Sequence, residues 1–195
     1  MSNVLILGAN GSVARIAIDL FHRETDAQLT LYLRNAGRLR NPDPTHIRVV
    51  EGDVLDTARL MEAMVGQDVV YANLAGDLER MARRIVAAMD AAGVRRLIFI
   101  SSMGIYDEVP GQRYSRILDP YRTAAEVIEA SDLDYTILRP GWFTDADEID
   151  YETTQKGEPF RGHDVSRKCV AALVVTLATS PTREVRRSLG VSTSD

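Results

Sequence analysis

Hydrophobic residues fall into short continuous runs, separated by turns and by segments with helical spacing. The first run, residues 4–7, stops at Gly8, and the apolar residues after it stand three or four positions apart. This pattern predicts a strand, a glycine turn and an amphipathic helix. Further apolar runs predict strands at residues 29–33, 47–50, 68–73, 97–100 and 135–138. Helical spacing predicts helices at 57–65, capped by Thr57, and at 78–92, 123–130 and 166–180.

The predicted strands are continuous apolar runs rather than alternations of apolar and polar residues. Strands of this kind are buried on both faces, as in a parallel sheet covered by helices. Strand and helix alternate about six times, and no linker divides the chain. The sequence therefore predicts an α/β fold: one domain over residues 1–195, a doubly wound parallel sheet with helices on both faces, known as a Rossmann fold.

Residues 141–160 depart from this pattern because they are strongly acidic. They hold one base, Lys156, and six acids: Asp145, Asp147, Glu148, Asp150, Glu152 and Glu158. One interpretation is a solvated excursion of the surface. The other is a flap near the substrate cleft, because the segment begins at the carboxyl end of the strand predicted at 135–138.

Composition narrows the class of protein further. The chain has 195 residues, of which 45% are hydrophobic, so it has enough apolar residues for a packed core. Its net charge of -5 offers no overall attraction to phosphate backbones, so we expect no nucleic-acid partner. It has one cysteine, no secretory signal and no apolar run of the roughly 20 residues that a membrane span needs. We expect a cytoplasmic protein without membrane segments.

The turn at residues 8–14, Gly-Ala-Asn-Gly-Ser-Val-Ala, lies between the first strand and the first helix. Gly8 permits a tight turn, and Gly11 lets the backbone approach a phosphate closely. Ala14 is small enough for the helix to pack on the strand. The helix N-terminus adds free N–H groups and the positive end of a dipole. This combination predicts a site for the pyrophosphate of a dinucleotide.

Arginines at the end of the second strand bear on the choice of cofactor. An acidic residue usually stands there and binds the ribose of NAD, but this chain has Arg34, with Arg38 one helical turn later. Guanidinium groups match a 2′-phosphate, so NADP (NADPH) is favoured, with NAD as the alternative. The alternative interpretation of Arg34 is a solvated residue at the end of a strand.

Four segments in order resemble the atypical short-chain dehydrogenase/reductase group. They are residues 8–14, residues 52–56 (Gly-Asp-Val-Leu-Asp), residues 101–104 (Ser-Ser-Met-Gly) and residues 135–141 (Tyr-Thr-Ile-Leu-Arg-Pro-Gly). Within that group they are most similar to the NmrA-like, NAD(P)H-binding branch, which includes flavin and quinone reductase-like proteins. The resemblance covers nearly the whole chain.

The resemblance implies roles for particular residues. Asp53 and Val54 would flank the adenine, residues 73–76 would line the cofactor, and the turn at residues 140 and 141 would approach the nicotinamide. The full set of expected cofactor-binding residues is Gly8, Asn10, Gly11, Ser12, Val13, Arg34, Arg38, Asp53, Val54, Asn73, Leu74, Ala75, Gly76, Ser101, Pro140 and Gly141.

The tyrosine–lysine pair of the classical members is missing. That pair has a lysine four residues after a tyrosine, and the lysine lowers the pKa of the tyrosine. Tyr121 is followed at this offset by Ala125, and the other alignment places Leu118 and Arg122 at the two positions. Because the only lysines of the chain are residues 156 and 168, sugar epimerisation or dehydration is not expected.

Hydride transfer to a flavin or quinone requires less of the protein, because it mainly holds two flat rings in contact. Trp142 and Phe143 are candidates to stack on such a ring, although core packing would explain them equally well. The candidate catalytic residues are Ser101 and Ser102, which follow a strand, and Tyr121. Tyr106 is a further candidate proton donor.

Two functions from different classes agree with these features. The first is an NADPH-dependent reductase of a small planar acceptor. The second is a non-catalytic, NAD(P)-sensing regulator that acts through a protein partner, with the arginines at 80, 83 and 84 as a candidate docking face. No metal site is expected, because His22, His46 and His163 lack the short spacings of metal ligands, and Cys169 falls on an apolar helix side.

Overall fold

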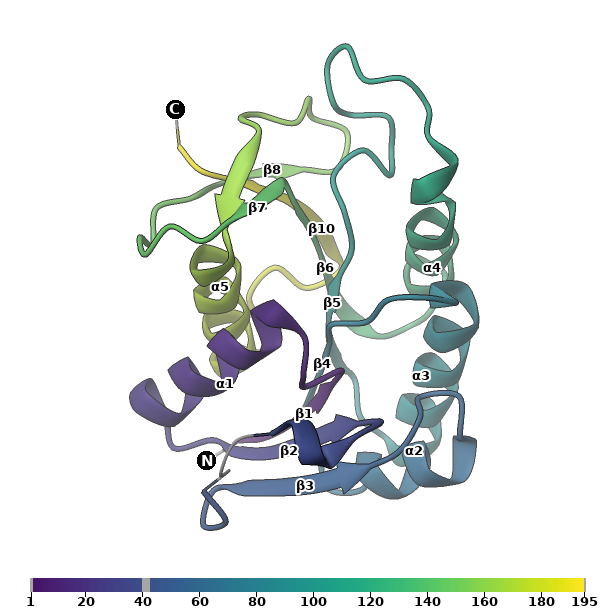
Figure 1. Cartoon of the computed structure of the whole chain (residues 1–195). Coiled ribbons are helices and arrows are strands. Elements are labelled where there is room, and N and C mark those ends of the chain that lie inside the picture. Colours follow the sequence, from purple (N-terminus) through teal and green to yellow (C-terminus); the bar gives the residue numbers. More distant parts are fainter. Residues whose placement is uncertain (1, 40–42, 195) are drawn as a thin grey trace.

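The computed structural model describes residues 2–39 and 43–194. At its centre lies an eight-stranded sheet (Figure 1). From edge to edge its strands are β3 (Ile47–Glu51), β2 (Gln28–Leu33), β1 (Asn3–Leu7), β4 (Val69–Ala72), β5 (Arg96–Ile100), β6 (Asp134–Pro140), β10 (Arg187–Ser192) and β8 (Glu152–Gln155). All neighbours pair in parallel except β8, which runs antiparallel to β10.

Helices cover both faces of this sheet, as predicted (Figure 1). On one face lie α1 (Ser12–Glu24) and α5 (Arg167–Thr179), and on the other lie α2 (Thr57–Met64), α3 (Leu78–Ala92) and α4 (Asp119–Glu129). Alternate residues of β1 belong to the two apolar clusters: Val4 and Ile6 pack in the α1–α5 layer, whereas Leu5 and Leu7 pack in the other. This double burial explains the continuous apolar runs, and the predicted doubly wound fold is confirmed. Among the described residues, no helix has both the length and the hydropathy needed to cross a bilayer.

Some predicted boundaries are wrong. The cap of α2 is Asp56 rather than Thr57, because the carboxylate of Asp56 accepts a hydrogen bond from the backbone N–H of Arg59 at 3.2 Å. Val65 lies beyond the end of that helix and is 70% exposed. Helix α4 begins at Asp119, earlier than predicted, because Pro120 is tolerated in a first turn that needs no N–H donor there.

Several strands in the last third of the chain were not predicted from the sequence. Strand β10 enters the main sheet between β6 and β8, and a separate two-stranded sheet joins β7 (Trp142–Thr144) to β9 (Asp164–Ser166). The β10 sequence, Arg-Ser-Leu-Gly-Val-Ser, has only two large apolar residues. Gly190 is required within it, because a Cβ there would lie 2.9 Å from the ring of Phe160.

The acidic segment 141–160 is anchored to the rest of the chain. Its strand β8 belongs to the main sheet, and its carboxylates at Asp145 and Asp147 form ion pairs with Arg167 (2.7 Å) and Lys168 (2.6 Å) at the start of α5. Both carboxylates are over 90% exposed, so the interpretation as a solvated surface fits this part of the segment.

Candidate functional site

A pocket of about 270 Å³ lies at the carboxyl ends of β1, β2 and β4. Strand order reverses at this point, since β2 and β4 flank β1 on opposite sides, and ligands of doubly wound sheets bind at such a point. The expected cofactor residues that line the pocket are Gly8, Asn10, Gly11, Arg34, Arg38, Asp53, Val54, Asn73, Leu74 and Ala75. Residues that line it but were not predicted are Tyr32, Leu33, Asn35, Gly52 and Met81.

The turn after β1 is fixed by the end of β4. Gly8 has a φ of +79°, and its N–H donates to the carbonyl of Tyr32 at 2.9 Å. A Cβ on Gly8 would overlap the backbone carbonyl of Asn73, and a Cβ on Gly11 would overlap the side-chain amide of Asn73. The glycines thus let the turn dock on Asn73, a packing reason that the sequence analysis did not foresee.

The first turn of α1 fits an anion. It starts at Ser12, has no side-chain cap at Gly11, and has no acidic residue in its first turn. Val13 is buried in the core, so its side chain packs away from solvent. Arg15 donates from Nε to the side-chain oxygen of Asn10 at 3.1 Å and so braces the loop. Unpaired N–H groups and the positive dipole end suit a pyrophosphate.

Arg34 and Arg38 stand free at the mouth of the pocket. Both are exposed, and neither makes an ion pair or side-chain hydrogen bond with any residue that the structure describes. The backbone between them is ordered by the 3₁₀ turn η1 (Ala36–Arg38): Asn35 accepts from the N–H of Gly37 at 3.1 Å. Two uncompensated guanidinium groups beside a nucleotide pocket match a phosphate monoester.

Tyr32 holds in place the side of the pocket that Asp53 lines. Its hydroxyl donates to the backbone carbonyl of Asp53 at 2.8 Å, and the Asp53 carboxylate accepts from the N–H of Leu55 at 2.9 Å. Burial raises the pKa of Tyr32 to about 12, so this donor keeps its proton at neutral pH. Tyr32 could not be recognised from the sequence as a pocket residue because it lies inside an apolar run.

The segment after β5 lies beside the end of β6. The N–H of Ser101 donates to Leu138 at 2.7 Å, and that of Met103 donates to Pro140 at 3.2 Å. The Ser101 hydroxyl is buried and has no hydrogen-bond partner among the described residues, whereas Ser102 donates to the carbonyl of Met103. A buried hydroxyl without a partner is an open donor for a ligand.

Six of the expected cofactor residues lie outside the 270 Å³ pocket. Ser12 and Val13 are in the first turn of α1, and Gly76 follows β4. Ser101 follows β5, and Pro140 and Gly141 are at the end of β6. The structure thus brings the adenosine side of the predicted set into one pocket and places the nicotinamide side next to it along the sheet edge. This extends the expected binding path along the carboxyl ends of the strands.

In both alignments of the missing tyrosine–lysine pair, residues of the described structure have other contacts at these positions. Leu118 is buried, and Arg122 donates to the carbonyl of Gly104 at 3.0 Å and to the carboxylate of Asp107 at 2.6 Å. The hydrogen bond with Asp107 raises the pKa of Arg122, so its guanidinium group stays protonated. Tyr121 is half-buried against the α3–α4 layer.

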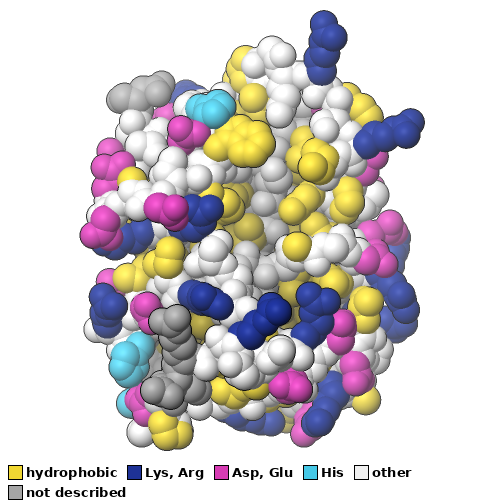
Figure 2. Space-filling model, in the orientation of Figure 1, with side chains coloured by type: hydrophobic (Ala, Val, Ile, Leu, Met, Phe, Trp, Pro, Cys, Tyr) yellow, Lys and Arg dark blue, Asp and Glu magenta, His cyan; other side chains and the backbone are white. Residues whose placement is uncertain are grey.

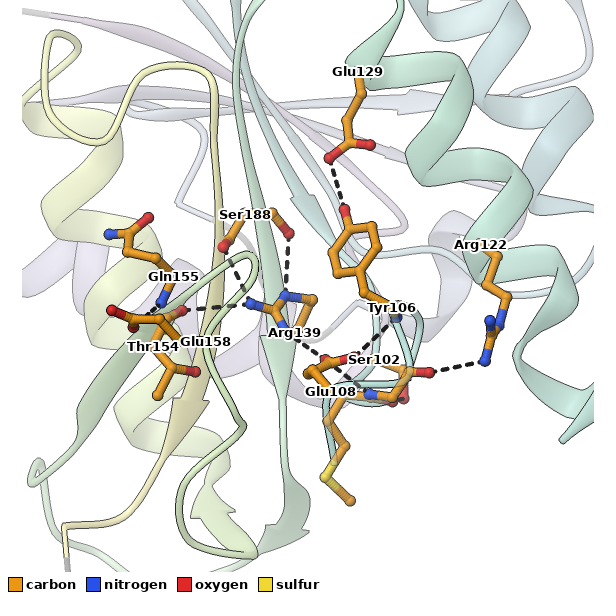
Figure 3. A network of polar contacts seen from close by, with 12 residues as sticks. Ser102, Tyr106, Glu108, Arg122, Glu129, Arg139, Thr154, Gln155, Glu158 and Ser188 are labelled. Atoms are coloured by element: carbon orange, nitrogen blue, oxygen red, sulfur yellow. Dashed lines mark hydrogen bonds and ion pairs between the residues drawn. The ribbon is translucent and has the colours of Figure 1, made fainter. Parts of the chain in front are cut away.

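Tyr106 is engaged in a buried network rather than poised in the pocket (Figure 3). Its hydroxyl donates to Glu129 at 2.8 Å, and burial raises its pKa. Its ring packs under Arg139, whose guanidinium lies 5.2 Å from the ring centroid and pairs with Glu108. The Glu108 carboxylate also accepts from the N–H groups of Gly104 and Tyr106, both at 2.9 Å. The network fixes the loop that follows Ser101, and Tyr106 has no free proton to offer.

Trp142 and Phe143 lie on the surface, on β7. Their exposed fractions are 61% and 36%, so the interpretation as core packing is wrong. The Trp142 ring lies 6.4 Å from that of His163, and the Arg167 guanidinium lies 5.2 Å above Phe143. On the face shown in Figure 2, hydrophobic side chains gather around a central hollow, and basic side chains form a row beside it.

Comparison with known proteins agrees with this geometry. The sequence profile of the family described as NAD(P)H-binding matches residues 8–181. A Rossmann-fold NAD(P)-binding family protein from Shigella flexneri is 45% identical, with a TM-score of 0.89 over 100% of this chain and 97% of that one. A short-chain dehydrogenases/reductase from Veillonella parvula in complex with NADP is 28% identical, with a TM-score of 0.89 over 98% and 94% of the two chains.

A curated relative comes from Bacillus subtilis and is called the uncharacterized sugar epimerase YhfK. It is 26% identical over 155 residues, which cover 71% of each chain. The predicted resemblance to short-chain dehydrogenase/reductase proteins is confirmed by these matches, and so is the expectation of an NAD(P)H cofactor. The chain belongs to the NAD(P)H-binding family.

Proposed function

We propose that this chain is an NADPH-dependent reductase that passes a hydride to a small planar acceptor, a quinone or a flavin. The observation that carries the choice of NADPH is the pair Arg34 and Arg38, which line the pocket without a carboxylate partner among the described residues. Arg34 stands where an acidic residue would bind the bare ribose of NAD, and Arg38 lies one helical turn later. Charge-assisted hydrogen bonds from guanidinium to phosphate favour the phosphorylated ribose.

Each part of the pocket has a task in this proposal. The N–H groups at the start of α1, with Gly8 and Gly11 in the turn before it, would hold the pyrophosphate. Asp53 and Val54, fixed by Tyr32, would flank the adenine. Bound NADPH would supply the hydride at the nicotinamide end of the site.

The acceptor side rests on Ser101, Pro140 and the exposed rings of Trp142 and Phe143. The hydroxyl of Ser101 is buried without a partner next to the Pro140 turn, so it would donate a hydrogen bond to the carboxamide of the cofactor or to a carbonyl of the acceptor. Exposed aromatic rings immediately after that turn would stack on a flat acceptor. The segment 141–160 would then border the acceptor site, within one domain formed by residues 1–195.

The chemistry fits a reduction that needs no activated tyrosine. Delocalised rings accept a hydride directly, and water or a hydroxyl can supply the proton, so positioning provides most of the catalysis. Sugar epimerisation, the activity in the name of the Bacillus subtilis relative, is disfavoured because neither alignment, Tyr121 with Ala125 or Leu118 with Arg122, supplies the tyrosine–lysine pair.

The second candidate is a nucleotide sensor that binds the cofactor without turnover. The absence of the tyrosine–lysine pair favours this candidate as well. Arg122 is committed to Asp107 and Gly104, and Tyr106 to Glu129, so the usual proton relay is absent from the described part of this site. Such a protein would bind NADPH and signal through a protein partner.

Binding and turnover assays separate the two candidates. The fluorescence of NADPH and NADH is titrated with the protein, and cofactor oxidation is then followed with benzoquinone, menadione, FMN and FAD. The reductase proposal expects tighter NADPH binding and oxidation with at least one acceptor. Trp142→Ala should lower turnover without changing NADPH affinity, whereas Ile149→Ala, at another exposed apolar residue of the segment, should change neither.

Tight NADPH binding without oxidation by any acceptor would refute the reductase and leave the sensor. If neither nucleotide binds, both candidates are wrong.

A further inference from the structure

Two histidines and an aspartate lie close together at the end of the sheet opposite to the cofactor pocket. His22 lies in the last turn of α1, Asp43 lies in the connection that leads to β3, and His46 immediately precedes β3. The carbonyl of His46 accepts a hydrogen bond from the N–H of Leu29, near the start of β2. The group therefore lies at the amino ends of the strands, whereas the cofactor pocket lies at their carboxyl ends.

The distances within this group suit a shared ion. One nitrogen or oxygen atom from each residue lies within 4.8 Å of those of the other two, and the imidazole centroids are 6.1 Å apart. Zinc binds nitrogen and oxygen ligands at about 2.0–2.2 Å, which places tetrahedral ligand atoms roughly 3–4 Å apart. Asp43 Oδ2 and His46 Nδ1 are already 3.0 Å apart. His22 is exposed near a helix end, so its side chain has room to change rotamer when an ion binds.

The aspartate is held in place by two contacts. Its Oδ1 accepts from the N–H of Thr45 at 2.9 Å, and its Oδ2 faces the ring of His46. A hollow of about 50 Å³, lined by His22 and His46 but not by Asp43, lies beside the group. A water molecule needs roughly 10–15 Å³ of such space, so the hollow has room for a water ligand of the ion.

We propose that His22, Asp43 and His46 bind one divalent transition-metal ion, with zinc as its representative. Two imidazoles and one carboxylate suit zinc, nickel or copper, whereas calcium and magnesium prefer oxygen ligands alone. The ion ties the end of α1 to the connection before β3, which is an edge strand of the sheet. Its role is to stabilise that edge, because its ligands stand away from the cofactor pocket. The sequence could not predict this site, because the fold, rather than a short spacing, brings His22 and His46 together.

Zinc binding to single-site variants tests the proposal. Calorimetry is performed with chelator-treated protein that carries no histidine tag, and with Mg²⁺ as the comparison ion. We expect one Zn²⁺ per chain, no comparable Mg²⁺ binding, and a loss of affinity in His22→Ala and His46→Ala. Removing an outer partner of a metal ligand costs about 10- to 100-fold, so removing a ligand should weaken binding by about tenfold or more. His163→Ala is the matched control, because His163 is also exposed and also contacts an aspartate, at 2.6 Å.

Thermal unfolding provides a second measurement that does not depend on the calorimetric signal. Free zinc at one hundred times its Kd should raise the Tm of the wild-type protein by about 5 °C or more. His22→Ala, without zinc, should unfold like the wild type, since its side chain is exposed, but should gain little from zinc. The proposal is overturned if the wild type binds no zinc, or if His22→Ala and His46→Ala bind it as tightly as His163→Ala does.

Discussion

The buried ion pair between Arg139 and Glu108 gives a sharp test of how the end of β6 is held. The side chains are 0% and 5% exposed (Figure 3). Besides Glu108, the Arg139 guanidinium donates to the hydroxyl and the carbonyl of Ser188, at 3.1 and 3.2 Å. Replacing it in Arg139→Met keeps a long apolar stem but leaves the carboxylate of Glu108 buried without its counter-charge.

The expected cost follows from this burial. Removing one member of a buried ion pair destabilises a protein by about 3–5 kcal/mol, because the remaining charge is uncompensated. For a chain of this length, about 2–4 °C of Tm corresponds to each kcal/mol, so Arg139→Met should lose roughly 6–20 °C. Adding Glu108→Gln should recover about 2 kcal/mol, because glutamine keeps an acceptor for the backbone N–H groups of Gly104 and Tyr106 without the charge.

Urea unfolding of the single and double variants measures these free energies. The matched control is Arg95→Met, whose ion pair with Asp132 has side chains 52% and 72% exposed, so it should cost under about 1 kcal/mol. If Arg139→Met costs no more than Arg95→Met, or if the double variant is no more stable than Arg139→Met, the charge of Glu108 is not what makes the loss severe.

Two further predictions concern the pocket itself. Gly8→Ala should destabilise the fold by about 2 kcal/mol or more in urea unfolding and abolish NADPH binding, because φ is +79° and a Cβ would overlap Asn73. The control is Gly66→Ala, because Gly66 has a φ of +75° but no atom near its Cβ position. It should cost about 1 kcal/mol in the same assay and leave NADPH binding unchanged. Because the folded-state pKa of Tyr32 is raised to about 12, its contribution to the free energy of unfolding is present below pH 10 and lost as pH rises through 10 to 12. In Tyr32→Phe this part of the alkaline loss should disappear; a loss as steep as in the wild type would show that Tyr32 ionises equally in both states.

The sequence predicts the core of the fold because the signal there is local. Strands such as β1 and β5 are buried on both faces, so every residue after the first one in each strand is apolar, and their neighbours in the chain form amphipathic helices. Strand β10 escapes prediction because its burial depends on partners far away in sequence. Its Gly190 packs against Phe160, and its buried Ser188 accepts hydrogen bonds from Arg139.

The same contrast separates the predicted and missed parts of the site. The glycine turn and Arg34 are recognised from their place between predicted elements, and the structure brings them into one pocket. Tyr32 was missed because a tyrosine in an apolar strand looks like core until its hydroxyl is seen to reach Asp53. The charged cluster around Arg139 was missed because its members come from the β5–α4 loop, β6 and β10.

The central claim is that the pocket selects NADPH through its free guanidinium groups, and a fluorescence titration of NADPH and NADH tests it most directly. A hydrogen bond to a charged group is worth about 1.5–3 kcal/mol, so Arg34→Ala should weaken NADPH binding roughly 10- to 100-fold and NADH binding little. Arg187→Ala, at an exposed arginine of β10, should change neither. Wild-type protein that binds NADH as tightly as NADPH, or an Arg34→Ala variant that loses both equally, would contradict the account.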